Sequence, residues 1–150
     1  MIFVPARRRT DLRRGCCAKQ INPRIQIIGV QAEGAPAIAN SFRTGERTPS
    51  DTVHTIADGI AVKTPGEKTF EYIKKYVDRV VTVSDDEIAS AVLLLLERCK
   101  QVVETSGAAP LAAVLNNKVD VKGKKVVCVL SGGNIDVSFI HKIVEKGLIT

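Results

Sequence analysis

The clearest pattern along the chain is a set of three short runs in which β-branched hydrophobic residues follow one another with few polar interruptions. They span Ile25–Val30, Arg79–Val83 and Val126–Leu130. Near-continuous runs of this length are typical of strands buried on both faces of a parallel sheet. Pro23 precedes the first run, where its missing N–H does not disturb a strand. We therefore expect three strands at these places.

Two of the segments between these runs begin with the signature of a helix N-terminus. Ser84–Glu87 has the form of a capping box, in which a hydroxyl and a glutamate three residues later bond the free backbone N–H groups. It predicts a long helix that continues to Cys99. Thr64–Glu67 has the same form, with proline at the first helical position, and predicts a helix to about Tyr76.

The remaining hydrophobic spacing predicts three further helices, separated by polar loops. The second of them contains Pro110, which a helix accepts only near its first turn because proline has no backbone N–H. Segments rich in Thr, Ser, Pro and Asp mark the loops. The expected helices are Ala35–Phe42, Gly107–Asn116 and a final amphipathic one with Ile140, Ile143 and Val144 on one side, and the expected loops include Thr48–Gly59 and Lys122–Lys124.

Strands and helices thus take turns along the chain, which predicts an α/β fold: a parallel sheet with helices on its faces. Ligands of such sheets bind beyond the carboxyl ends of the strands. The loop Ser131-Gly132-Gly133-Asn134 lies there, directly after the third expected strand. It offers a hydroxyl, close backbone approach through two glycines, and a following helix whose first amides attract negative charge.

Two interpretations of this loop stay open at this point. It could hold a polar cofactor or an anion, or it could be a tight strand-to-helix turn with Asn134 or Asp136 as the helix cap. The loop is not a Walker-type phosphate loop, because the GxxxxGK[ST] pattern is missing.

Length and composition limit the class of protein. The chain has 150 residues, the size of one domain, with 45% hydrophobic and 25% charged residues. No apolar run approaches the roughly 18 residues of a membrane span, and no secretory signal is recognisable, so we expect a cytoplasmic protein. The four cysteines have no metal-ligand spacing and are expected to be reduced: Cys16, Cys17, Cys99 and Cys128.

The net charge of +6 is concentrated at the N-terminus. Residues 1–24 hold seven basic residues and one acidic residue, whereas the other 126 residues hold 15 of each sign. A basic arm on a neutral body is a pattern of nucleic-acid-binding proteins. This arm, however, lacks interleaved aromatic residues, a known binding motif and a basic stripe that continues into the domain, so nucleic acid is a disfavoured partner.

Five sequence blocks, in order, carry a resemblance to a known family. They are IIGVQAEGAPAI, HTIADGIAVKTPG, DRVVTVSDDEIASA, VVETSGAAPLAAVL and KKVVCVLSGGNID. Residues 21–150 resemble the carboxyl half of the catalytic domain of threonine ammonia-lyase (threonine dehydratase), a pyridoxal-phosphate enzyme with the tryptophan synthase β-like fold. The resemblance implies a partial domain of that fold and pyridoxal 5′-phosphate as the cofactor.

The resemblance also implies roles for individual residues. Ser131 matches the serine that bonds the pyridine nitrogen of the cofactor, and Gly132 and Gly133 match glycines that shape the loop against the ring. Glu104 matches a glutamate beside the ring, although a solvated charge at a helix end is the alternative for this residue. A hydroxyl at Ser131, unlike a carboxylate, does not hold the ring nitrogen protonated, which favours elimination of a β-leaving group.

No metal site is expected in this chain. Some relatives bind a cation through a Glu and an Asp that correspond to Gln31 and Ala37 here. Glu33 is not in register to replace them. His54 and His141 have no second ligand at a suitable spacing, so an ordinary surface or partly buried histidine is expected at both positions.

The activity that the resemblance implies is the deamination of L-threonine to 2-oxobutanoate and ammonia, a reaction of isoleucine biosynthesis, by an enzyme that is homo-oligomeric at full length. The lysine that carries the cofactor belongs to a Ser-Phe-Lys block, which these 150 residues do not contain. We therefore expect no catalytic residue here, an inactive isolated chain, and a piece that is cut at both ends. Alternatives are a fragment of a serine dehydratase or racemase, or a noncatalytic fragment whose basic arm binds nucleic acid.

The start of the chain departs from the family pattern. Ile2–Ala6 reads IFVPA, after which the family has a run of glycines that holds the cofactor phosphate. Here RRRTDLRRGCC follows instead. Since the glycine codon GGC read one nucleotide out of phase gives CGG, an arginine codon, we hypothesise that residues 7–17 are a frame-slipped phosphate loop. Residues 1–20 are then an aberrant basic arm, with residues 6–20 facing solvent or poorly ordered.

Overall fold

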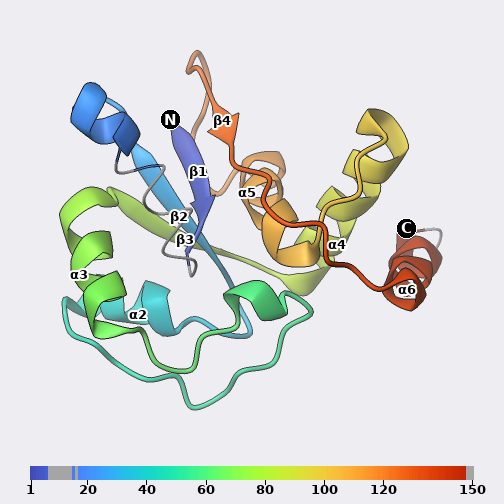
Figure 1. Cartoon of the computed structure of the whole chain (residues 1–150), viewed down its shortest axis with the longest axis horizontal. Helices are drawn as coiled ribbons and strands as arrows, with labels where there is room; N and C mark the ends of the chain where they lie inside the picture. Colours follow the sequence, from blue (N-terminus) through green and yellow to red (C-terminus); the bar gives the residue numbers. More distant parts are fainter. Residues whose placement is uncertain (7–14, 16, 148–150) are drawn as a thin grey trace.

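The sheet is parallel throughout, as the alternation of elements predicts. The computed structural model of the chain describes residues 1–6, 15 and 17–147. Its strands lie in the order β3-β2-β1-β4, and each neighbouring pair is parallel (Figure 1). Their bounds are β1 Ile2–Pro5, β2 Ile27–Ala32, β3 Arg79–Val83 and β4 Val127–Cys128.

Strand β1 lies inside the sheet, although the hydrophobic pattern did not predict it. Its four residues pair with β2 from Ile2 opposite Ile27 to Pro5 opposite Val30. Phe3 and Val4 are both completely buried, one on each face of the sheet. A run of only four residues at the chain end gives little periodicity, so its burial became visible only with its two neighbours in place.

Strand β4 is shorter than the predicted Val126–Leu130 because of Pro5. The N–H groups of Ile2 and Ala6 donate toward β2, to the carbonyls of Gln26 and Val30 at 2.8 Å each. Backbone groups alternate along a strand, so position 5 faces β4, where a proline has no N–H to give. The ladder on this side therefore ends after Val129 donates to the Phe3 carbonyl at 3.0 Å.

Helices cover both faces of the sheet. Phe3, Ile28 and Val30 point into one hydrophobic core with α4, α5 and α6, and the alternate residues Val4 and Ile27 point into a second core with α2 and α3. Figure 1 shows the first group of helices on the right and the second at the lower left. Their bounds are α2 Ala37–Thr44, α3 Glu67–Tyr76, α4 Asp85–Leu94, α5 Thr105–Leu115 and α6 Val137–Gly147, with a 3₁₀ turn at Asp58–Ile60 and a π turn at Leu95–Cys99.

One predicted capping box is confirmed and the other is wrong. At Ser84–Glu87 the Glu87 N–H donates to Ser84 Oγ at 3.2 Å and the Ser84 N–H donates to Glu87 Oε2 at 2.8 Å. The helix that follows reaches Cys99 through the π turn, as predicted. At Thr64–Glu67 no side-chain cap forms, because Gly66 is extended (φ −65°, ψ 139°) and α3 begins only at Glu67.

Helix α5 begins two residues before its predicted start. Its first residue is Thr105 rather than Gly107, so Pro110 lies inside the helix and not in its first turn. Small buried residues surround this part of the helix, which packs against β1, β2 and β3. Tertiary packing thus overrides the cost of an interior proline.

The expectation of a solvent-facing segment over residues 6–20 is wrong at two described positions. Ala6 is 1% exposed and Gly15 is buried, with space for a β-carbon limited by Ile27 at 3.0 Å. Residues 17–21 are helical, and Lys19 forms an ion pair with Asp78. Residues 7–14 and 16, which make up most of the proposed frame slip, lie outside the described residues. The division at residues 20 and 21 remains a prediction.

The described helices are too short or too polar to cross a membrane.

Candidate functional site

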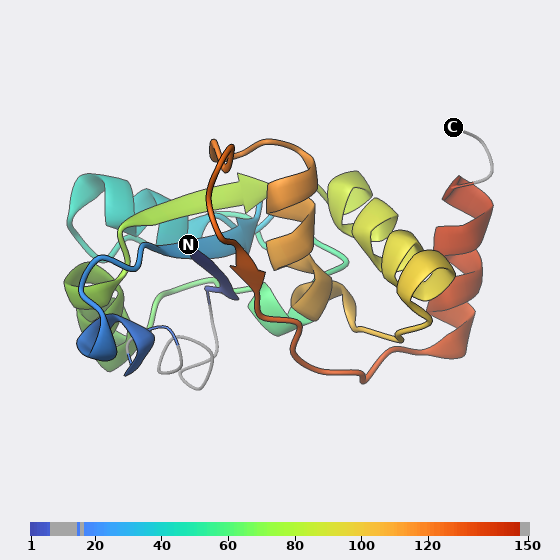
Figure 2. The same cartoon turned by 90° about the horizontal axis from the view of Figure 1, so that it is seen from above.

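The Ser131–Asn134 loop lies against the start of α5. After β4 the chain passes beside the first turn of that helix on its way to α6 (Figure 2). The Glu104 N–H donates to the Gly132 carbonyl at 3.1 Å, and the Asn134 N–H donates to Glu104 Oε2 at 3.4 Å. Two segments that are 30 residues apart in sequence therefore form one site beyond the end of β4.

Glycine is required at two contacts between the loop and the helix. Gly132 has φ +87°, and a β-carbon on it would lie 2.3 Å from Glu104 Cδ. A β-carbon on Gly107 would lie 2.1 Å from the Ser131 carbonyl oxygen. No heavier residue fits at either point without displacing the loop, because both distances are well below van der Waals contact.

Glu104 is the N-cap residue of α5 and is 8% exposed. Its backbone carbonyl accepts hydrogen bonds from the N–H groups of Gly107 at 2.9 Å and Ala108 at 3.0 Å. The alternative of a solvated charge at a helix end is therefore wrong. A carboxylate at a helix N-terminus is favoured by the helix dipole, which offsets part of the cost of its burial.

A second turn closes the site from the side of the sheet. A β-carbon on Gly59 would lie 2.5 Å from Ser106 Oγ and 3.3 Å from Glu104 Oε1, so these two oxygens lie on the same side of Gly59. This turn follows a strongly held segment. Asp85 accepts hydrogen bonds from Thr55 Oγ1 at 2.5 Å and from the Ile56 N–H at 3.0 Å, and Thr105 Oγ1 donates to the Ile56 carbonyl at 2.9 Å.

Ser106 was not among the predicted site residues. It is 3% exposed, and its hydroxyl has no hydrogen-bond partner; among the described side chains only Gln31 Nε2 shares this property. A serine in an alanine-rich helix gives no sequence signal of a site. Its position becomes informative only when the fold brings the Gly59 turn and Glu104 beside it.

The two positions that correspond to a cation site in some relatives have a structural role here. Gln31 is completely buried, and its Oε1 accepts hydrogen bonds from the N–H groups of Ile38 and Ala39, both at 3.0 Å. It thereby bonds the first turn of α2, which has no side-chain cap of its own. Ala37 is buried in the same turn. In the part of the chain that the structure describes, His, Cys, Asp and Glu form no group of three suited to a metal.

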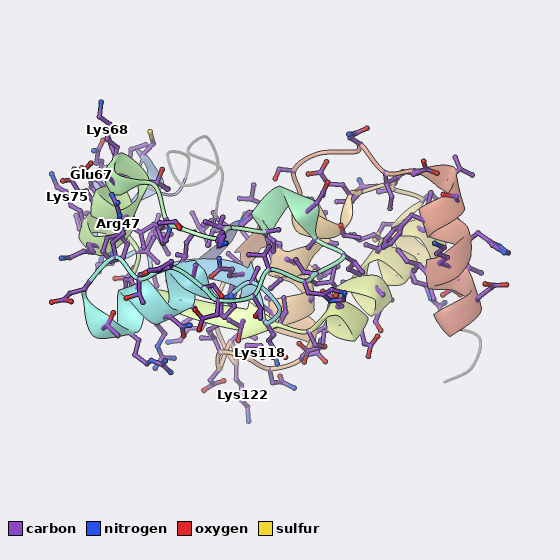
Figure 3. The ribbon with its side chains drawn as sticks, turned by 90° about the horizontal axis from the view of Figure 1, so that it is seen from below. Arg47, Glu67, Lys68, Lys75, Lys118 and Lys122 are labelled. Carbon is purple, nitrogen blue, oxygen red and sulfur yellow. The ribbon has the colours of Figure 1, made fainter. Side chains whose placement is uncertain are left out.

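A large hollow lies elsewhere. It measures about 720 Å³ and runs between α2 and β3, with Arg43, Arg79 and Lys118 among its lining residues. Figure 3 labels Lys118, whose Nζ lies 2.8 Å from Glu87 Oε1 and 3.6 Å from Glu33 Oε1. The hydrogen bond with Glu87 raises the pKa of Lys118 above its ordinary value. None of Ser131, Gly132, Gly133 and Glu104 lines this hollow.

Comparisons with known proteins agree with the fold. The family model "Pyridoxal-phosphate dependent enzyme" matches residues 15–132. An L-threonine ammonia-lyase of Thermotoga maritima is 54% identical over 131 residues, which are 87% of this chain and 32% of that protein. The chain spans about a third of the length of such curated relatives.

Solved structures show the same similarity in three dimensions. The processed form of threonine deaminase isoform 2 from Solanum lycopersicum matches 99% of this chain and 42% of its own, with a TM-score of 0.88 and 32% identity. Serine racemase from Dictyostelium discoideum matches 91% of this chain and 44% of its own, with a TM-score of 0.81 and 36% identity.

Proposed function

We propose, on the premise that this chain belongs to the family of pyridoxal-phosphate dependent enzymes, that it is part of an enzyme which deaminates L-threonine to 2-oxobutanoate and ammonia. The 54% identity to an L-threonine ammonia-lyase supports threonine as the substrate. The observation that carries the proposal is the packing of the Ser131–Asn134 loop against the buried carboxylate of Glu104. In this proposal residues 21–150 form the carboxyl half of the catalytic domain.

The residues at the start of α5 fit a flat polar cofactor. Gly132 has no side chain, so its backbone lies directly against the Glu104 carboxylate, and the buried hydroxyl of Ser106 has no hydrogen-bond partner among the described residues. Ser131 would bind the ring nitrogen, Gly132 and Gly133 would lie against the ring, and Glu104 would lie beside it. Bound pyridoxal phosphate supplies an electron sink for negative charge at the α-carbon of an amino acid.

With the cofactor bound, Ser131 would moderate the strength of that electron sink. A hydroxyl bonds a pyridine nitrogen without holding it protonated, whereas a carboxylate would stabilise the protonated form. The weaker electron withdrawal favours loss of the β-hydroxyl of the substrate over longer-lived charge at the α-carbon. Glu104 would contribute through its position, since its backbone N–H bonds the Gly132 carbonyl and its carboxylate accepts from the Asn134 N–H.

The test of the proposal compares the chain alone with a protein that also contains the lysine that the family requires. The 150-residue chain alone is expected to form no 2-oxobutanoate from threonine, because the Ser-Phe-Lys block is not part of its sequence. A protein that joins this chain to such a block is expected to form it. Turnover by the 150-residue chain alone would contradict this assignment of the lysine, and absence of turnover by the joined protein would contradict the proposed function.

A serine-specific enzyme is the second candidate, because the serine racemase of Dictyostelium discoideum shares 36% identity and a TM-score of 0.81 with this chain. The two candidates differ in the ratio of kcat/KM for L-threonine to that for L-serine, measured in the joined protein. A search for D-serine among the products completes the distinction. A ratio above one with 2-oxobutanoate as product supports the threonine enzyme.

The cellular setting belongs to the same proposal. Since 2-oxobutanoate is a precursor of isoleucine, we assign the enzyme to isoleucine biosynthesis in the cytoplasm, as a homo-oligomer. In the test, a strain that lacks the gene should fail to grow without isoleucine. Growth should recover when isoleucine is added.

A further inference from the structure

Ser106 stands out because a buried hydroxyl without a partner is unfavourable. It is the second residue of α5, and its Oγ faces the backbone of Gly59. Burial removes the hydroxyl from water, and nothing in the described chain replaces those hydrogen bonds. A buried hydroxyl without a partner calls for an explanation. A role in binding is one explanation, and the residues around Ser106 show whether it is reasonable.

The other buried serine in a helix shows that the fold can satisfy such a group. Ser41 is completely buried in α2. Its Oγ donates to the Thr48 carbonyl at 3.1 Å and accepts from the Thr48 N–H at 2.8 Å. The missing partner of Ser106 is therefore a property of its place, next to the candidate site, and not of serine in this protein.

An acceptor lies close to Ser106. A β-carbon built on Gly59 would contact both Ser106 Oγ, at 2.5 Å, and Glu104 Oε1, at 3.3 Å. The other oxygen, Oε2, accepts from the Asn134 N–H over 3.4 Å, which is long for a hydrogen bond to a carboxylate. The bond from the Asn134 N–H to Glu104 is therefore weak, and Glu104 Oε1 and Ser106 Oγ lie on the same side of Gly59.

Binding of a ring at the loop would disturb the first of these contacts. The Gly132 backbone leaves no room even for a β-carbon between itself and the Glu104 carboxylate, since that carbon would lie 2.3 Å from Cδ. A ring that enters beside Ser131 and Gly132 therefore moves the loop and the carboxylate apart. That movement takes the carboxylate away from the Asn134 N–H and lets it turn toward Gly59, beside which Ser106 Oγ lies.

We propose that Ser106 is a positioning residue for the cofactor, whose hydroxyl donates a hydrogen bond to the Glu104 carboxylate once that carboxylate leaves the Asn134 N–H. The inference rests on the proposed function, because it takes pyridoxal phosphate as the ligand of the loop. It assigns Ser106 two opposite effects: the hydroxyl destabilises the chain without cofactor and strengthens the chain's hold on the cofactor.

The experiment measures both effects in the 150-residue chain. Urea unfolding is followed for the unsubstituted chain, Ser106→Ala and the matched control Ser41→Ala, each with and without millimolar pyridoxal phosphate. Without cofactor, Ser106→Ala should raise the folding equilibrium constant about fivefold, because it removes an unsatisfied polar group, whereas Ser41→Ala should lower it. In binding, Ser106→Ala should weaken pyridoxal phosphate about tenfold, the loss of one charge-assisted hydrogen bond.

Each other outcome overturns a defined part of the inference. If Ser106→Ala destabilises the chain as Ser41→Ala does, the hydroxyl has a partner within the fold and the inference fails. If Ser106→Ala stabilises the chain but binds pyridoxal phosphate as tightly as before, the link to Glu104 fails while the proposed function stands. If pyridoxal phosphate does not stabilise the unsubstituted chain at all, the inference fails, whereas the proposed function is still decided by the turnover of the joined protein.

Discussion

The two faces of the sheet use the same kinds of residue to different ends. On the side of α2, Ser41 and the Oε1 of Gln31 bond backbone groups that would otherwise have no partner. On the side of α5, Ser106 is also buried but has no hydrogen-bond partner among the described residues, and Gly132 takes a left-handed conformation against a buried carboxylate. Ser41 and Gln31 Oε1 thus stabilise the fold on the first side, whereas the Ser106 hydroxyl on the second side is the group for which we propose a role toward a ligand.

The largest expected effect is a loss of stability at the contact between α5 and the Ser131–Asn134 loop. Gly107→Ala places a β-carbon 2.1 Å from the Ser131 carbonyl, so the loop must leave the helix or the helix must shift. We expect the free energy of unfolding in urea to fall by about 3 kcal/mol, the upper range for overpacking a tight contact.

The control for Gly107→Ala is Gly45→Ala. Gly45 has φ +79° but nothing within 4 Å of a β-carbon, so only backbone strain of about 1 kcal/mol is expected there. Equal losses for the two variants would show that the loop does not pack on α5 in solution.

The next effect tests the first region. Ser41→Ala removes both hydrogen bonds to Thr48 and leaves the Thr48 N–H without its partner. The free energy of unfolding should fall by about 1.5 kcal/mol, as for a buried donor left unpaired. Native-state hydrogen exchange of the Thr48 amide is the direct measurement, and unchanged protection would contradict the role given to Ser41.

The smallest effect concerns the ion pairs at Lys118, which join the loop after β2 to the start of α4. Because its pKa is raised in the folded state, the stability that Lys118 contributes is present below its ordinary pKa of 10.5 and is lost as pH rises through the folded pKa. A urea midpoint measured from pH 9 to 12 should therefore fall slightly more in the unsubstituted chain than in Lys118→Met. If the urea midpoints of the two proteins fall equally with pH, the ion pairs of Lys118 do not contribute to stability.

The sequence predicted those elements whose signals are local. The runs that became β2 and β3, and the capping box at Ser84, carry their own periodicity or spacing, and each is present. Strand β1 and the early end of β4 depend on each other through Pro5, a pairing that no local pattern contains. The failed box at Thr64 shows that the right residues do not make a cap when the backbone stays extended at Gly66.

The candidate site was predictable only in part. The Ser131–Asn134 loop follows a recognisable strand and matches a family motif, so its place beyond the sheet could be expected. The resemblance, and not spacing, predicted Glu104 beside the same ring as the loop, and the contact between Glu104 and the loop became visible only in the structure. Ser106 and Gly59 could not be predicted, because their importance arises from burial and from the meeting of segments 47 residues apart.

The central claim is that the Ser131 hydroxyl binds the ring of pyridoxal phosphate, and a binding isotherm tests it most directly. Equilibrium dialysis of pyridoxal phosphate against the unsubstituted 150-residue chain, Ser131→Ala and the control Ser90→Ala, an exposed serine on α4, gives three dissociation constants. The account predicts a value about tenfold higher for Ser131→Ala and an unchanged value for Ser90→Ala. The same dissociation constant in all three proteins would contradict it.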